Sequence, residues 1–136
     1  GLLGAVAPDF DLFWCYLVDN GQRHHHLYPS HWPLLWFALL AATLVWAGIA
    51  KNKLPAWLGV VFCLNSIAHL LLDTLVGDIW WLMPFVNQPF AFFHITAVHH
   101  PWWLNFLLHW SFLLELALVV AAIAMWCRRN AKMVNA

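Results

Sequence analysis

The sequence predicts an all-α integral membrane protein, a small bundle of three transmembrane helices with a short N-terminal or interfacial helical segment before them. Composition is the first observation: 64% of the 136 residues are hydrophobic and only 9% are charged, whereas soluble domains carry about 25% charged residues. The second is a set of three long apolar stretches, and the third is an uneven distribution of lysine and arginine between them. The length predicts a single membrane-embedded domain over residues 1–136.

Three apolar stretches are long enough to cross a bilayer, which takes about 20 mostly apolar residues, with a range of about 17–25. We expect spans at about 34–50, 55–77 and 102–127; these are Leu34–Ala50, Pro55–Gly77 and Trp102–Cys127. Residues Gly1–Ala7 are too short to span and fit the end of a further helix. Because no Met opens the chain, we expect the natural protein to continue upstream. Phe10–Val18 fits an interfacial helix.

Positive charge orients the predicted bundle. Five of the six basic residues follow the first or the third span, and only Arg23 lies on the opposite side; the five are Lys51, Lys53, Arg128, Arg129 and Lys132. Cytoplasmic segments of membrane proteins collect lysine and arginine. We therefore expect a multi-pass membrane protein with a cytoplasmic C-terminus.

The net charge and the cysteine content limit the kinds of partner that we expect for this protein. The formal net charge is zero, so no basic surface suggests nucleic acid. The three cysteines are odd in number and far apart, which favours ordinary buried thiols. We expect contact with membrane lipid. We also expect a homo-oligomer or a partner membrane protein, because three spans enclose little interior of their own.

Two short motifs on the predicted outer side carry metal-binding side chains. PDFD places Asp9 and Asp11 two residues apart in an extended or turn segment. They could chelate a cation or form a solvated turn. HHHLYPSH places His26 and His31 on either side of a Tyr-Pro-Ser turn. They could be imidazole ligands or part of an interfacial patch, with His24 and His25 beside them.

HLLLD, from His69 to Asp73, is the most specific motif, because an i,i+4 pair lies on one face of a helix. Ionisable groups inside a span are costly and usually functional, although a His–Asp hydrogen bond can also simply join helices. The three motifs together place six candidate metal ligands on the predicted outer side of the membrane: Asp9, Asp11, His26, His31, His69 and Asp73. Six ligands suffice for a binuclear site with a bridging water. We expect Zn²⁺, with Mn²⁺ or Fe²⁺ as alternatives.

Other polar groups of the predicted outer loops could complete a catalytic site. We expect Asp78, His99 or His100 to serve as the general acid. His94 fits a ligand, a proton shuttle or a plain surface residue. Glu115, deep in the third apolar stretch, is expected to be structural.

In this order, GAVAPDFD, HLYPSH and HLLLD followed by IWWLMPF, the motifs resemble those of bacterial membrane-bound metal-dependent hydrolases, inner-membrane proteins described as LexA-binding hydrolases. The family pattern is GxxxPDxD, an H-R-G-x-T-H-like loop, and an H-x3-D helix followed by a tryptophan-proline stretch. The resemblance covers roughly residues 4–85. In this loop the family's Arg-Gly after the first histidine and its Thr before the second histidine are missing. Arg23 could take the place of the family arginine. Members of the family usually also have an earlier helix with its own histidine, and the printed sequence shows none.

The resemblance implies a hydrolase, and the H-x3-D helix is also similar to zinc-dependent phospholipase C enzymes, which cleave phosphoesters. With the resemblance, we expect a metal-dependent hydrolase of the bacterial inner (plasma) membrane. Its metal site should face the periplasm, and it should act on lipid or lipid-linked phosphoesters. Two other classes stay open. One is a non-catalytic membrane subunit or metal-binding partner of a larger assembly. The other is a di-iron histidine-box oxidoreductase, although such enzymes generally keep their histidine boxes on the cytoplasmic side.

Overall fold

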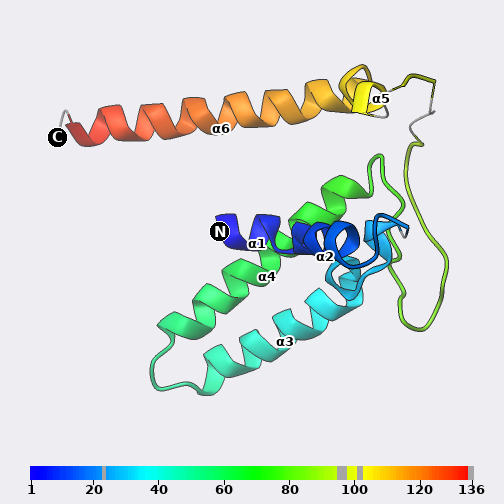
Figure 1. Ribbon diagram of the computed structural model, residues 1–136. Coiled ribbons are helices and arrows are strands. Elements are labelled where there is room, and N and C mark those ends of the chain that lie inside the picture. Colours follow the sequence, from blue (N-terminus) through cyan, green and yellow to red (C-terminus); the bar gives the residue numbers. More distant parts are fainter. Residues whose placement is uncertain (23, 95–97, 101–102, 135–136) are drawn as a thin grey trace. The chain divides into compact units, whose positions relative to one another are not determined.

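The computed structural model describes residues 1–22, 24–94, 98–100 and 103–134. The regular secondary structure of this part of the chain is helical apart from one isolated β-bridge (Figure 1). The predicted all-α class is therefore confirmed for the described residues. The chain divides into two compact units, Gly1–His94 and Ile95–Ala136. The helices of the first unit are α1 (Leu2–Val6), α2 (Asp11–Leu17), α3 (Pro33–Ile49) and α4 (Leu54–Asp73). Three short 3-10 helices lie between them: η1 (Pro8–Phe10), η2 (His25–Leu27) and η3 (Pro29–His31).

Helices α3 and α4 form a hairpin, and the turn between them is residues 50–53 (Figure 1). Each helix has a proline in its first turn, where the missing N–H group would have had no partner within the helix. The two helices bury a small apolar core that consists of Trp36, Cys63, Ile67 and Leu70. The first predicted span, 34–50, corresponds closely to α3.

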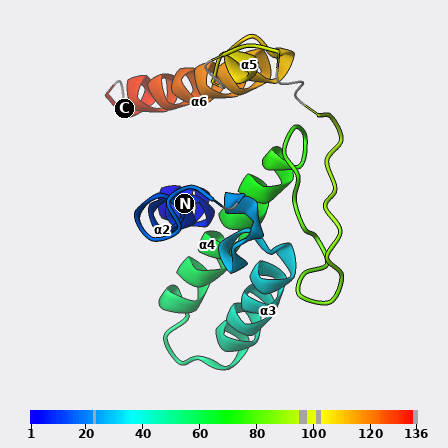
Figure 2. The same cartoon turned by 45° about the vertical axis from the view of Figure 1, so that its right-hand side comes forward.

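Helix α1 packs against the middle of α4 (Figure 1 and Figure 2). Gly4 permits this approach, since a Cβ atom there would lie 2.3 Å from the carbonyl oxygen of Phe62. The fully buried Ser66 hydroxyl of α4 donates a hydrogen bond of 2.8 Å to the Gly4 carbonyl. This contact brings η1, which follows α1, against α4.

Helix α4 ends earlier than the predicted span 55–77. It stops at Asp73, and residues 74–77 form a turn. The chain then runs out as the long yellow-green loop of Figure 2 and returns. Ile79 and Phe90 pair as the β-bridge, and the Phe92 N–H donates a 2.8 Å hydrogen bond to the Thr74 carbonyl. The loop therefore lies against the C-terminal end of α4.

The second unit contains α5 (Trp103–Leu107) and α6 (Trp110–Val134). The prediction of one continuous helix over 102–127 was wrong, because the helix is interrupted at residues 108–109; Trp102 itself lies outside the described residues. The His109 side chain caps α6, with Nδ1 accepting from the Ser111 N–H at 3.4 Å. A side-chain acceptor at this position starts a new helix.

Two helices of the described chain are long and apolar enough to cross a membrane, Leu54–Asp73 and Trp110–Ala131. Helix α3 is also apolar but has only 17 residues, so the three-span bundle stays a prediction. Helix α2 lies within the predicted interfacial helix Phe10–Val18.

Candidate metal centre

His31 is fully buried, and its imidazole is held from one side by a carboxylate. Its Nδ1 donates a 2.5 Å hydrogen bond to Asp11 Oδ2, and the Ser30 hydroxyl donates to the same oxygen at 2.5 Å. Burial opposes protonation of His31, but the hydrogen bond with Asp11 and the nearby Asp9 outweigh it and raise the pKa of His31. Because Nδ1 carries a hydrogen, Nε2 is the atom that can offer a lone pair to a cation.

Nε2 of His31 is one of four neighbouring side-chain atoms that could bind a cation. Nε2 lies 3.7 Å from Asp9 Oδ1 and 3.8 Å from Asp73 Oδ2. His69 Nε2 lies 3.5 Å from Asp9 Oδ1 and 3.0 Å from Asp73 Oδ2. As the i,i+4 spacing predicted, His69 and Asp73 project from the same face of α4. We call Asp9, His31, His69 and Asp73 the four-residue cluster; its members come from η1, η3 and α4.

The dimensions of the four-residue cluster fit a divalent cation. Nitrogen and oxygen ligands about 2.0–2.2 Å from a tetrahedral zinc ion lie about 3.3–3.6 Å from each other. The four His–Asp separations within the cluster, out of six pairs, are 3.0–3.8 Å. Two carboxylates also balance the charge of a divalent ion.

Hydrogen bonding gives a second, independent test of the fit. Within the described chain, the buried atoms His31 Nε2, His69 Nε2 and Asp73 Oδ2 make no hydrogen bond of regular geometry, although the last two lie 3.0 Å apart as an ion pair. Most buried polar groups in native proteins do make a hydrogen bond, so each exception needs an explanation. A shared cation would give all three atoms a partner. The group Asp9, His31 and His69, whose ligand atoms lie within 4.8 Å of one another, could hold a metal ion.

The PDFD segment is helical, so the predicted extended or turn conformation was wrong. Asp9 belongs to η1 and Asp11 begins α2. Residues two apart in a helix point about 200° away from each other. Asp9 therefore approaches Nε2 of His31, whereas Asp11 bonds to Nδ1. The structure thus places Asp11, predicted as a metal ligand, as the residue that orients His31.

The charge of Asp9 suits a metal ligand. Burial alone would raise the pKa of Asp9, but its contacts with His31 and His69 lower the pKa well below its usual range. Its side chain is 42% exposed, whereas that of His31 is 0% exposed. Water and solutes can therefore reach the four-residue cluster from the Asp9 side.

His26, the sixth predicted ligand, lies on another side of His31, with ring centroids 4.6 Å apart. Its Nδ1 donates a 2.9 Å hydrogen bond to the backbone carbonyl of Asp78. Burial, and then the neighbouring His25 and His31, lower the pKa of His26 to about 3. The His26 imidazole is therefore neutral near pH 7, the form that binds metals.

Of the predicted general acids, only Asp78 belongs to the same unit as the four-residue cluster. The Asp78 carboxylate lies 3.7 Å from Nδ1 of His94, and both side chains are exposed. His99 and His100 belong to the second unit, where the His99 N–H donates to Asn105 Oδ1 at 2.7 Å. Their roles as acids stay predictions, and Arg23 lies outside the described residues.

Sequence reasoning missed two contributions to this region. His25 belongs, with His26 and His31, to a second group that could hold a metal ion. The run of three consecutive histidines, His24 to His26, was the sequence signal that could have indicated it. The backbone carbonyl of Asp78 orients His26, and no sequence pattern marks that role. Comparisons with protein-family models, curated proteins and solved structures find no match.

Proposed function

We propose that the protein is a metal-dependent hydrolase of the bacterial inner membrane that holds its catalytic ion at the four-residue cluster. The observation that carries the proposal is a group of four donor atoms in which Asp9, His31 and His69 each offer one ligand atom within 4.8 Å of the others, and Asp73 Oδ2 lies 3.0 Å from His69 Nε2. Three of them are buried and make no hydrogen bond of regular geometry among the described residues. A divalent ion there would supply a Lewis acid and lower the pKa of a water molecule toward neutrality.

The protein's own groups divide the remaining tasks. His31 and His69 contribute neutral nitrogen donors, and Asp11 holds His31 in the tautomer that presents Nε2. Asp9 lies at the exposed side of the cluster. Four protein donors leave a position for water or substrate when the ion takes five or six ligands. Mn²⁺ and Fe²⁺ accept such coordination, and Zn²⁺ can expand to five.

The proposed substrate is a lipid or lipid-linked phosphoester. Apolar side chains beside Asp9 and Asp11 support an amphiphilic substrate, since Phe10, Phe13 and Trp14 are each more than half exposed. Aromatic side chains at such positions favour the membrane–water interface. Five of the six lysines and arginines lie on the opposite side of the predicted spans, which favours a position of the four-residue cluster at the periplasmic face.

A second candidate function follows from the number of protein donors. Four side-chain donors in a tetrahedron are typical of structural zinc sites. The protein would then be a non-catalytic, metal-stabilised membrane subunit in which the ion joins η1 and η3 to α4. Metal content alone would not separate the two functions, but turnover would.

The test measures metal and turnover on the same samples. Detergent-purified protein is analysed by inductively coupled plasma mass spectrometry beside Asp9→Asn and His69→Ala, with Asp19→Asn and His94→Ala as matched controls outside the cluster. Phosphate release is then measured from vesicles of phosphatidic acid in phosphatidylcholine, with added Zn²⁺ or Mn²⁺.

We expect bound metal and phosphate release in the wild type and both controls, and loss of both in the two cluster variants. Folded wild-type protein without metal would overturn the proposal. Bound metal without turnover on any phosphoester would favour the structural role.

A further inference from the structure

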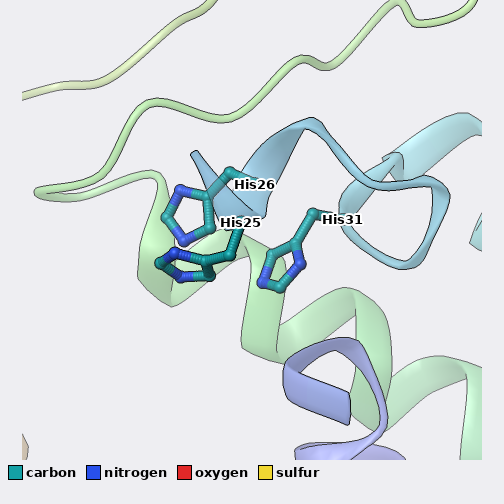
Figure 3. A group of neighbouring side chains, drawn as sticks. All are labelled: His25, His26 and His31. Atoms are coloured by element: carbon teal, nitrogen blue, oxygen red, sulfur yellow. The ribbon is translucent and has the colours of Figure 1, made fainter. Parts of the chain in front are cut away.

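Three histidines of the segment between α2 and α3 form a second cluster beside the four-residue cluster; they are His25, His26 and His31. The ring centroids of His25 and His26 lie 4.1 Å apart, and those of His25 and His31 lie 5.4 Å apart. One nitrogen from each of the three rings lies within 4.8 Å of the others. Figure 3 shows the rings of His25 and His26 side by side, with His31 facing them. We call these residues the histidine trio.

Backbone and carboxylate contacts fix two of these rings. His26 Nδ1 donates to the Asp78 carbonyl and His31 Nδ1 donates to Asp11. A carbonyl oxygen can only accept a hydrogen bond, so Nδ1 of His26 carries the hydrogen and Nε2 carries the lone pair. In the neutral form of either ring, the hydrogen therefore stays on Nδ1 and Nε2 is left for a cation, the arrangement found around metal-binding histidines.

The loop is also packed tightly against the end of α4. A Cβ atom at Gly77 would lie 3.0 Å from Cε1 of His26 and 3.1 Å from the Asp73 carbonyl oxygen. His26 is 9% exposed and His31 0% exposed. Glycine at position 77 therefore lets the His26 ring lie directly on the turn, and the trio is held by surrounding structure rather than displayed on a free loop.

We propose that His25, His26 and His31 form a second cation site, selective for borderline divalent ions such as Zn²⁺, Co²⁺, Ni²⁺ or Cu²⁺. It goes beyond the proposed function, because His25 and His26 are not members of the four-residue cluster. Three neutral imidazoles suit these ions, whereas a site with two carboxylates also accepts harder ions such as Mn²⁺.

The two sites share His31, so they compete for the same nitrogen atom. With Nδ1 bonded to Asp11, only Nε2 of His31 can bind a cation, and one nitrogen lone pair serves one ion at a time. The trio and the four-residue cluster are therefore alternative positions that compete for His31. This differs from the two-ion centre expected from the sequence.

The test uses Co²⁺ on detergent-purified full-length protein in which Asp9→Asn and His69→Ala together remove the four-residue cluster. After desalting, Co²⁺ is counted by mass spectrometry and its visible absorption recorded. We expect close to one equivalent of Co²⁺, lost when His25→Ala is added and retained when His24→Ala is added as the matched control. Absence of Co²⁺ from the folded double variant, or Co²⁺ unaffected by His25→Ala, would overturn the inference.

Cu²⁺ binding to the intact wild type keeps the proposal testable if the double variant does not fold. Electron paramagnetic resonance at substoichiometric Cu²⁺ counts the coordinating nitrogens. We expect three in the wild type and two in His25→Ala, and an identical spectrum in both would overturn the inference. Mn²⁺ binding that is lost in Asp9→Asn but unchanged in His25→Ala would support the four-residue cluster separately, so the two proposals fail independently.

Discussion

Asp11→Asn tests whether the carboxylate behind His31 acts as an orienting residue. The 2.5 Å hydrogen bond to Nδ1 is charge-assisted, and the Asp11 side chain is only 5% exposed. Such bonds are roughly twice as strong as neutral ones, and loss of a partner behind a metal-binding histidine costs about 10–100-fold in metal affinity. Because burial here is nearly complete, we expect the upper part of that range, about 30–100-fold, or about 2–2.7 kcal/mol.

Isothermal titration calorimetry with Zn²⁺ in detergent would measure this loss, with Asp19→Asn as the control for removing a carboxylate elsewhere. The absorption spectrum of bound Co²⁺ should keep its shape, because all four ligands of the cluster remain. A changed spectrum together with complete loss of binding would show that Asp11 is itself a ligand. Unchanged affinity would refute the orienting role.

Three further predictions concern packing and pH. Gly4→Ala should destabilise the protein by about 3 kcal/mol or more, since the new Cβ would meet the Phe62 carbonyl oxygen at 2.3 Å. The control Gly48→Ala, with no atom within 4 Å, should be neutral or stabilising in the same thermal unfolding assay in detergent. Ser66→Ala should cost about 1 kcal/mol by removing the bond to Gly4, and an unchanged midpoint would contradict that bond's contribution. The pKa of His31 is raised in the metal-free protein, so a cation must displace a proton; Zn²⁺ affinity should rise with pH and fall in acid, and a flat profile between pH 5 and 8 would contradict this linkage.

Helical periodicity made part of the candidate site predictable. The i,i+4 spacing of His69 and Asp73 requires that they share a face once α4 forms, and their atoms are 3.0 Å apart. The short Tyr-Pro-Ser turn likewise limits the separation of His26 and His31, whose ring centroids are 4.6 Å apart. These relations are local, so a linear pattern contains them.

The roles of Asp9 and Asp11 could not be read in the same way. An extended PDFD segment would point both carboxylates to one side, whereas a helical one separates them. The helical form depends on α1 packing at Gly4 and Ser66, more than 50 residues apart in the chain. Capping of α6 by His109 is another local contact that apolar periodicity does not reveal.

The joining of η1 to α4 also has a consequence for biosynthesis. Residue 9 leaves the ribosome 60 positions before residue 69, and at about 5–20 residues per second that interval is about 3–12 s. During this time the N-terminal segment carries two carboxylates and several exposed aromatic rings without the helix that later receives them. A chain that spends seconds in this half-assembled form is a natural target for membrane chaperones and proteases.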